Sequence, residues 1–231
     1  MGFDIYGMNP VIKKGSVKPE RPFEYPGYPE EYDSDTWSCS KEEYQELVKE
    51  WRYKRDNDLE YQALLSKYYE DVRAYEDENP GIYFRANVWW WRPIALFLEE
   101  NMLFLSDEDI AGLAYNDSHI ITKDKAERIG QHIKDLNEIG AVDAWVRDKK
   151  IAIVMIPKED CTICEGTGVR TDEPMFGHLE PYTKNDIEGL KCNGCNGEGK
   201  RDPWESNYPY DTEIILEFGK FAEESGGFQI C

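Results

Sequence analysis

Two copies of one cysteine–glycine pattern constrain this chain more than any other feature of its sequence. Cys161 and Cys164 precede Gly166 and Gly168, and a second C-x-x-C-x-G-x-G stretch occupies residues 192–199. Two thiolates separated by two residues can bind one metal ion from a tight turn, and two such turns supply the four sulfurs of a closed tetrahedral zinc site. The glycines let the backbone turn close to the sulfurs, in conformations that a Cβ atom disfavours.

We therefore predict one structural zinc ion, bound by Cys161, Cys164, Cys192 and Cys195. Because four thiolates leave no position for water or substrate, the ion is predicted to hold the fold together and not to catalyse a reaction. Disulfide bonds are the alternative, which we favour less because no secretory signal is visible and the Gly-x-Gly pattern suits metal hairpins. The two remaining cysteines, Cys39 and Cys231, are interpreted as free thiols.

The two repeats resemble the cysteine-rich zinc finger of DnaJ-type co-chaperones, a family that carries four such repeats around two zinc ions. The resemblance covers roughly residues 160–200. It implies paired β-hairpins around one zinc ion here, together with a peptide-binding or protein-binding surface. It does not imply a co-chaperone. A J-domain requires a His-Pro-Asp tripeptide, and no histidine of this chain is followed by proline.

The strongly acidic charge of the chain limits the kinds of molecule that it can bind. The 231 residues include 47 acidic and 27 basic side chains, and the formal net charge is -20. Such a balance opposes direct binding to nucleic acid or to an anionic membrane surface. No apolar run approaches the length of a bilayer span. We therefore expect a cytoplasmic protein whose partner is another protein.

The order of sequence patterns predicts an α+β fold: a mostly helical domain with a small sheet, plus an inserted zinc-bound β-hairpin module. We divide the chain into an α+β domain (1–157), the zinc module (158–202) and a C-terminal helix and strand (203–231) that pack back on the first domain. The strand near residues 228–230 is expected to pair close to a strand at residues 2–6.

Within the first domain, the proline-rich segment 9–35 is expected to be extended along the surface or partly disordered. The capping box Ser40–Glu43 begins a helical pattern that continues to about residue 78, as one helix or two. Further helices are expected at 106–115, from Thr122 to Gly140 or slightly beyond, and from residue 211 or 212 to about 225.

Two apolar runs are read as strands. Residues 82–91 form a β-type run, after which Pro93 suits the first position of a short helix. Residues 151–156 form a continuous apolar run between Lys150 and Pro157, which is consistent with a buried strand leading into the zinc module.

A second group of residues predicts a possible ligand pocket. Three consecutive tryptophans (89–91) cannot all face one side of an element, and nearby arginines can pair with an anion while an indole stacks on a planar ligand. The sequence 115–119 adds an aspartate and a histidine that are suited to acid–base chemistry. The alternative is that Trp89 and Trp91 are core side chains and that 115–119 is an ordinary turn. The six candidates are Arg85, Trp90, Arg92, Tyr115, Asp117 and His119.

We assign no catalytic residue, because no nucleophile elbow, P-loop, dinucleotide fingerprint or HExxH motif is present. Our favoured hypothesis is a non-enzymatic, zinc-stapled protein that binds another protein. A small-ligand-binding protein or unrecognised enzyme is the first alternative, and an acidic mimic of nucleic acid is the second.

Most of the chain outside residues 19–78 also resembles a group of uncharacterised phage and bacterial proteins. The resemblance rests on stretches such as 1–7, 83–93, 115–119 and 225–228. It supplies no activity, but it implies a phage or accessory-gene setting. If the source is a phage, inhibition or redirection of a host factor is a natural role.

Overall fold

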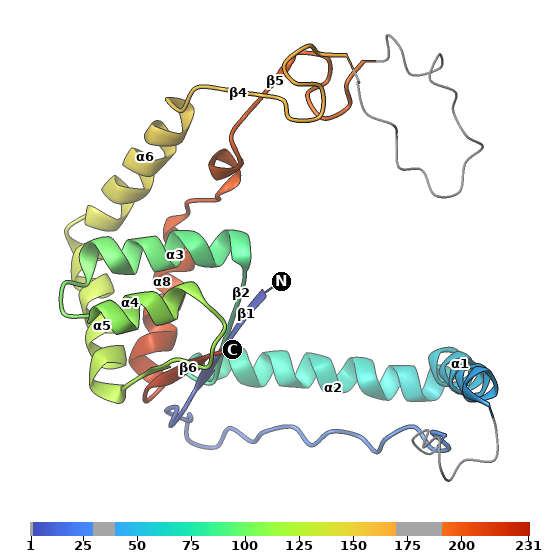
Figure 1. Cartoon of the computed structure of the whole chain (residues 1–231). Coiled ribbons are helices and arrows are strands. Elements are labelled where there is room, and N and C mark those ends of the chain that lie inside the picture. The colour runs from blue at the N-terminus through green and yellow to red at the C-terminus, as the bar shows by residue number, and fades with distance from the viewer. Residues whose placement is uncertain (1, 30–39, 170–190) are drawn as a thin grey trace.

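A computed structural model describes residues 2–29, 40–169 and 191–231 (Figure 1). Helices pack against a small antiparallel sheet, and a separate two-stranded ribbon carries the cysteines. The predicted α+β fold class is confirmed. The division into three parts stays a prediction, although the elements on both sides of the ribbon contribute to one sheet.

The four-stranded sheet joins the two ends of the sequence. β1 (Gly2–Gly7) lies between β2 (Tyr83–Asn87) and β6 (Phe228–Ile230), and β3 (Ile120–Ile121) flanks β6 on its other side. Ile5 of β1 is paired with Phe84 of β2 and with Ile230 of β6. The expected pairing of the first and last strands is therefore confirmed. β3 has only two residues, too few to produce an alternating pattern that sequence reasoning could detect.

The main core lies where α5 (Lys123–Glu138) and α8 (Thr212–Glu224) pack against each other and α8 packs against the sheet. Phe84 and Phe218 meet edge to face with ring centroids 5.3 Å apart. The two helices approach closely because Gly130 lacks a Cβ, which would lie 2.6 Å from the carbonyl oxygen of Gly219. Burial of these apolar side chains is the main force that holds the helices on the sheet.

Helix α3 (Val88–Asn101) corrects the prediction of a β-type run through residue 91. The side chain of Asn87 accepts hydrogen bonds from the backbone N–H groups of Trp89 and Trp90, so a strong N-cap ends β2 and starts the helix. Pro93 consequently lies inside α3 and not at its first position. Only Trp91 is a core side chain, because helical geometry turns Trp89 toward solvent.

Trp91 also connects α3 to the next helix. Its indole N–H donates to the carbonyl oxygen of Leu113, 2.6 Å away, in α4 (Asp107–Ala114). The predicted helices at 106–115, at the segment that follows Thr122, and at 211–225 are confirmed as α4, α5 and α8. Gly140, with a φ of 73°, separates α5 from α6 (Ala141–Val154).

Helix α6 corrects the prediction of a buried strand at residues 151–156. The helix continues through Val154, and its end is exposed: Ile151 is 55% exposed, Val154 83% and Met155 77%. A short continuous apolar run does not by itself distinguish a strand from a helix. The helical phase here is set upstream, where Val142 and Val146 are buried.

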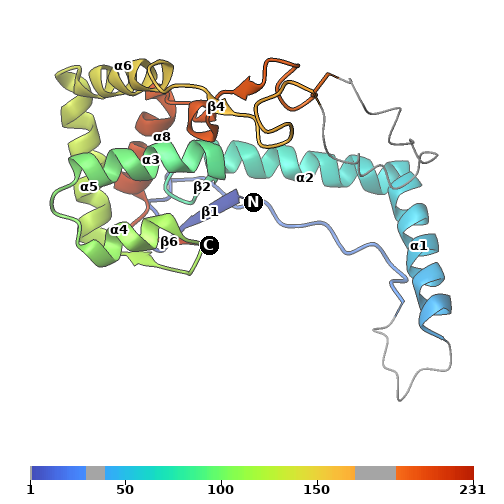
Figure 2. The same cartoon turned by 45° about the horizontal axis from the view of Figure 1, so that its top comes forward.

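Residues 40–78 form two helices, α1 (Lys41–Asn57) and α2 (Leu59–Glu78). The capping box of Ser40 and Glu43 is present, and Asp58 separates the helices by capping α2. Figures 1 and 2 show α2 extending away from the helical body with α1 at its far end.

The proline-rich segment, described as far as residue 29, follows α2 from its C-terminal end outward to α1. The backbone N–H of Lys13 donates to Asn79 Oδ1 at 2.7 Å, and the indole N–H of Trp51 donates to the carbonyl oxygen of Pro26 at 2.9 Å. The expected extended segment is therefore confirmed for residues 9–29. Residues 30–35 lie outside the described chain.

The cysteine-bearing ribbon lies between α6 and α8. Its strands are β4 (Glu159–Asp160) and β5 (Lys200–Arg201), and the 3-10 helix η1 (Trp204–Asn207) leads from it to α8. The four cysteines form a small cluster of their own, separate from the main core. Among the described residues, no helix is both long and apolar enough to cross a lipid bilayer.

Candidate metal centre

The structure brings together the four cysteines that the sequence singles out. Their sulfur atoms all lie within 4.8 Å of one another, and the Sγ–Sγ distances are 3.8 Å for Cys161–Cys192 and 3.7 Å for Cys164–Cys195. All four side chains are buried. A disulfide needs a separation of about 2.05 Å, so these thiols are not bonded in pairs. Four sulfurs placed tetrahedrally at about 2.3 Å from one zinc ion would be about 3.8 Å apart, which matches the observed spacing.

The two repeats fold alike and bind each other's backbone. The N–H of Cys161 donates to the carbonyl oxygen of Gly199 at 2.8 Å, and the N–H of Cys192 donates to that of Gly168 at 2.9 Å. This reciprocal pair of backbone hydrogen bonds holds the two cysteine turns face to face. Each repeat is therefore incomplete without the other, which explains why the sequence contains two.

Glycine is required where the repeats cross. Gly168 and Gly199 have φ values of 77° and 74°, a region that side chains disfavour. A Cβ on Gly168 would lie 2.4 Å from the carbonyl oxygen of Gly197, and one on Gly199 would lie 2.2 Å from that of Gly166. The second glycine of each repeat thus permits a backbone contact that any other residue would block.

Backbone donors point at the sulfurs. The N–H groups of Gly168 and Gly199 lie 3.3 Å from the sulfurs of Cys164 and Cys195, respectively. Burial by itself would raise the pKa of the Cys161 thiol, but backbone N–H groups of Ile163 and Cys164 lower that pKa to about 7. Burial raises the pKa of Cys192 to about 11. Donors to sulfur favour the thiolate, while four buried thiolates need a cation to balance their charge.

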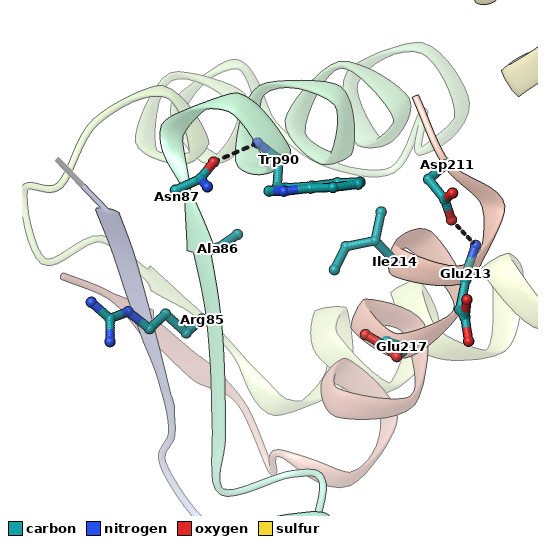
Figure 3. A pocket seen from close by; sticks show the side chains of 8 residues that line it. All are labelled: Arg85, Ala86, Asn87, Trp90, Asp211, Glu213, Ile214 and Glu217. Carbon is teal, nitrogen blue, oxygen red and sulfur yellow. Dashed lines mark hydrogen bonds between the residues drawn. The ribbon is translucent and has the colours of Figure 1, made fainter. Parts of the chain in front are cut away.

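Of the six pocket candidates, only Arg85 and Trp90 line the same hollow. This pocket, of about 600 Å³, is shown in Figure 3. Trp90 faces Ile214 across it, whereas the guanidinium of Arg85 points away and lies 3.7 Å from Asp4. The other charged lining residues are acidic: Asp211, Glu213 and Glu217. Such a lining opposes the anionic ligand that the sequence suggested.

The other four candidates lie elsewhere. Arg92 lines a different hollow, beside Tyr208 and Tyr210. Tyr115 ends α4 and is exposed. The carboxylate of Asp117 accepts a hydrogen bond from the backbone N–H of His119 at 3.3 Å, as in an ordinary turn. The ligand site formed by all six residues therefore stays a prediction, and this geometry does not strengthen it.

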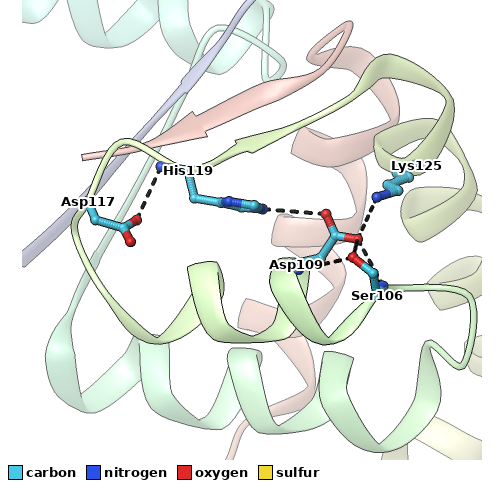
Figure 4. A network of polar contacts seen from close by, with 5 residues as sticks. All are labelled: Ser106, Asp109, Asp117, His119 and Lys125. Atoms are coloured by element: carbon cyan, nitrogen blue, oxygen red, sulfur yellow. Dashed lines mark hydrogen bonds and ion pairs between the residues drawn. The ribbon is translucent and has the colours of Figure 1, made fainter.

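A buried polar network that sequence reasoning missed surrounds Asp109 (Figure 4). Its carboxylate lies 2.5 Å from Lys125 Nζ, 2.6 Å from the Ser106 hydroxyl and 3.4 Å from His119 Nε2. Burial alone would raise the pKa of Asp109, but hydrogen bonds from Lys125, Ser106 and His119 outweigh it and hold that pKa well below its usual range. The network ties α4 to α5 and to the turn before β3. The spacing of Ser106 and Asp109 is a helix-capping signal, but no sequence pattern links them to the other two residues.

The comparisons with known proteins supply no relative: no family model matches the chain, and no curated protein or solved structure matches it. The class is therefore defined by geometry alone, as an α+β protein in which four buried cysteine sulfurs lie close enough to hold one metal ion.

Proposed function

We propose that the four cysteines bind one structural zinc ion and that the protein acts by binding another protein. The observation that carries the first half is the sulfur spacing, which suits a tetrahedral ion bound by four thiolates. Soft thiolate sets also suit iron. Zinc is our choice because the paired glycine pattern resembles a zinc finger, and because a redox-inert ion suits a purely structural site.

The proposed ion has a structural role because, among the described residues, the ribbon has no core apart from the cysteine cluster. The cysteine cluster packs only against Ile163 among the hydrophobic side chains of the described residues. Four protein ligands would fill the tetrahedral positions, so the site offers no place for a substrate. In zinc-binding modules of this size, metal binding supplies most of the folding free energy.

Exposed apolar side chains on the elements beside the ribbon support the second half of the proposal. Val154 and Met155 are exposed at the end of α6, and Trp204 is 56% exposed in η1. Contiguous exposed apolar surface marks protein interaction sites more often than isolated side chains do. We propose that the partner binds here and, on the resemblance to phage proteins, that it is a host factor.

Metal analysis and affinity capture test the two halves together. The purified protein should contain one zinc ion per chain and no iron, and Cys161→Ser/Cys192→Ser should contain none. Cys231→Ser, which changes an exposed cysteine, is the matched control and should retain the ion. A host protein captured by the wild type and by Cys231→Ser, but not by the double variant, would support the proposal. Iron in place of zinc would refute the first half of the proposal. Equal capture of the host protein by the wild type and by the metal-free double variant would refute the link between metal binding and partner binding.

A further inference from the structure

The end of α6 carries an apolar groove that the described part of the chain leaves uncovered. Ile151, Val154 and Met155 follow one another at helical spacing, so they share one face of the helix. The buried side chain of Val146 forms part of the groove floor, and the groove has a volume of about 550 Å³. Its largely apolar lining suits inserted side chains of a partner better than a polar ligand.

The rim of this groove is basic, in a chain that is strongly acidic overall. Arg147 and Lys150 line it on the same helix. Among the described residues, Arg147 forms an ion pair with its neighbour Asp148, at 3.6 Å, and Lys150 forms none. The single acidic lining residue, Asp143, already accepts a hydrogen bond from the Thr212 hydroxyl at 2.6 Å. The groove thus combines an apolar lining with two cations. The ion pair of Arg147 with Asp148 is exposed and therefore weak, so both Arg147 and Lys150 can pair with carboxylates of a partner.

We infer that this groove binds an amphipathic helix of a partner protein, whose apolar side chains enter the groove and whose flanking carboxylates pair with Arg147 and Lys150. A helix presents anchors at spacings of three and four residues, which match the spacing of the exposed side chains on α6. The inference rests on the proposed function, because it names the chemistry of the protein partner. The acidic surface elsewhere does not prevent this pairing, since salt screens charges beyond about 8 Å at physiological ionic strength.

A second copy of the chain fits the groove less well. In a two-fold pair, α6 would face α6, and each copy would bring Arg147 and Lys150 toward the same two cations of the other. An acidic helix avoids this repulsion between like charges. The test below distinguishes self-association from binding of an acidic helix.

The test uses two labelled amphipathic peptides of about 18 residues, long enough to populate a helix. Both carry the same leucine face, and they differ only in having glutamates or lysines beside it. Fluorescence anisotropy measures binding to the full-length, zinc-loaded protein. The methyl resonance of Met155, assigned with Met155→Leu, reports whether a peptide occupies the groove, and that of the buried Met102 is the internal control.

The glutamate peptide should bind and shift the Met155 methyl signal, and the lysine peptide should bind at least about tenfold more weakly. Arg147→Gln/Lys150→Gln should remove this preference, and Val154→Ser should weaken binding of the glutamate peptide. Leu103→Ser, at an exposed apolar residue that does not line the groove, should leave binding unchanged.

Equal binding of the two peptides, or none at about 1 mM, would overturn the inference. So would a concentration-dependent dimer, seen by light scattering, that Val154→Ser dissolves. If the wild type and Val154→Ser capture the same host partner equally, the groove and the partner surface at the end of α6 are both wrong, while zinc-dependent binding of a protein partner stands. If the peptide binds the groove but no host protein is captured, the proposed function fails and the groove stands.

Discussion

At the scale of single residues, Gly168 and Gly199 have the most demanding environments in the metal centre. Each combines a positive φ with a backbone carbonyl where a Cβ would be placed. Gly140 also has a positive φ, but nothing lies within 4 Å of its Cβ position. Comparing substitutions at Gly168 and Gly140 therefore separates two contributions to the loss of stability: the left-handed backbone conformation, and the clash of a Cβ with a carbonyl oxygen.

We predict that Gly168→Ala lowers zinc affinity more than about tenfold, because the two repeats can no longer pack against each other. Gly140→Ala should cost only the left-handed conformation, about 1–2 kcal/mol of folding stability, and should leave zinc affinity unchanged. Competition with a chelator measures the affinity, and denaturant unfolding measures the stability. Equal zinc affinities for wild type and Gly168→Ala would contradict the role given to this glycine.

Asp109 is the buried charge on which the polar network depends. Asp109→Asn removes the charge that Lys125 faces, and it should cost about 1–3 kcal/mol at pH 7. The lower part of this range is expected, because the side chain of Lys125 is 35% exposed. Asp117→Asn is the control: Asp117 is exposed, and its substitution should change stability by less than about 0.5 kcal/mol.

The same carboxylate predicts a dependence on pH. Because folding lowers the pKa of Asp109, its contribution is fully present above the pKa of an unfolded aspartate, about 3.9. The contribution is lost as the pH falls below that value toward the folded pKa. Denaturant unfolding should therefore show the gap between wild type and Asp109→Asn narrowing below about pH 4. A gap that stays constant would mean that folding does not lower the pKa of Asp109.

At the scale of elements, the N-caps of α3 and α5 show how much a capping side chain contributes to the stability of a helix. Asn87 accepts two backbone N–H groups at the start of α3, whereas the side chain of Thr122 accepts none at the start of α5. We predict that Asn87→Ala costs about 1 kcal/mol, and that Thr122→Ala costs only a few tenths. Thermal unfolding measures both. Similar losses for the two variants would show that helix propensity, and not the cap, decides the result.

Elements with local signals could be predicted from the sequence. The capping box at Ser40 and the spacing of the four cysteines depend on residues within a few positions of each other, so they could be read directly. One error came from the continuous apolar run at 151–156, which has no period, so only the surrounding structure decides whether it becomes strand or helix. The other came within 82–91, where residues 83–87 do form β2 but the N-cap of Asn87 then starts α3. The Asp109 network could not be found either, because Lys125 and His119 reach it from separate elements.

At the scale of the whole molecule, the described residues form two hydrophobic clusters that do not share side chains. We predict that a strong chelator unfolds the ribbon and leaves the helical domain intact, because only the cysteine cluster depends on the metal. Hydrogen exchange should rise in residues 159–169 and 191–201, and the protection of α5 and α8 should not change. Loss of protection in α5 or α8 would show that zinc stabilises the entire fold.

The central strands of the sheet come from opposite ends of the sequence, since β1 pairs with β6 and the N–H of Asp4 donates to the carbonyl oxygen of Cys231. The ribosome therefore completes β1 long before it makes its neighbour β6. Until β6 emerges, β1 has one unpaired edge, and the side chains of Phe3 and Ile5 lack the core that α8 and β6 complete. The sheet consequently cannot be completed before residues 228–230 have been made, and the nascent chain must keep its first strand from pairing with other chains until then.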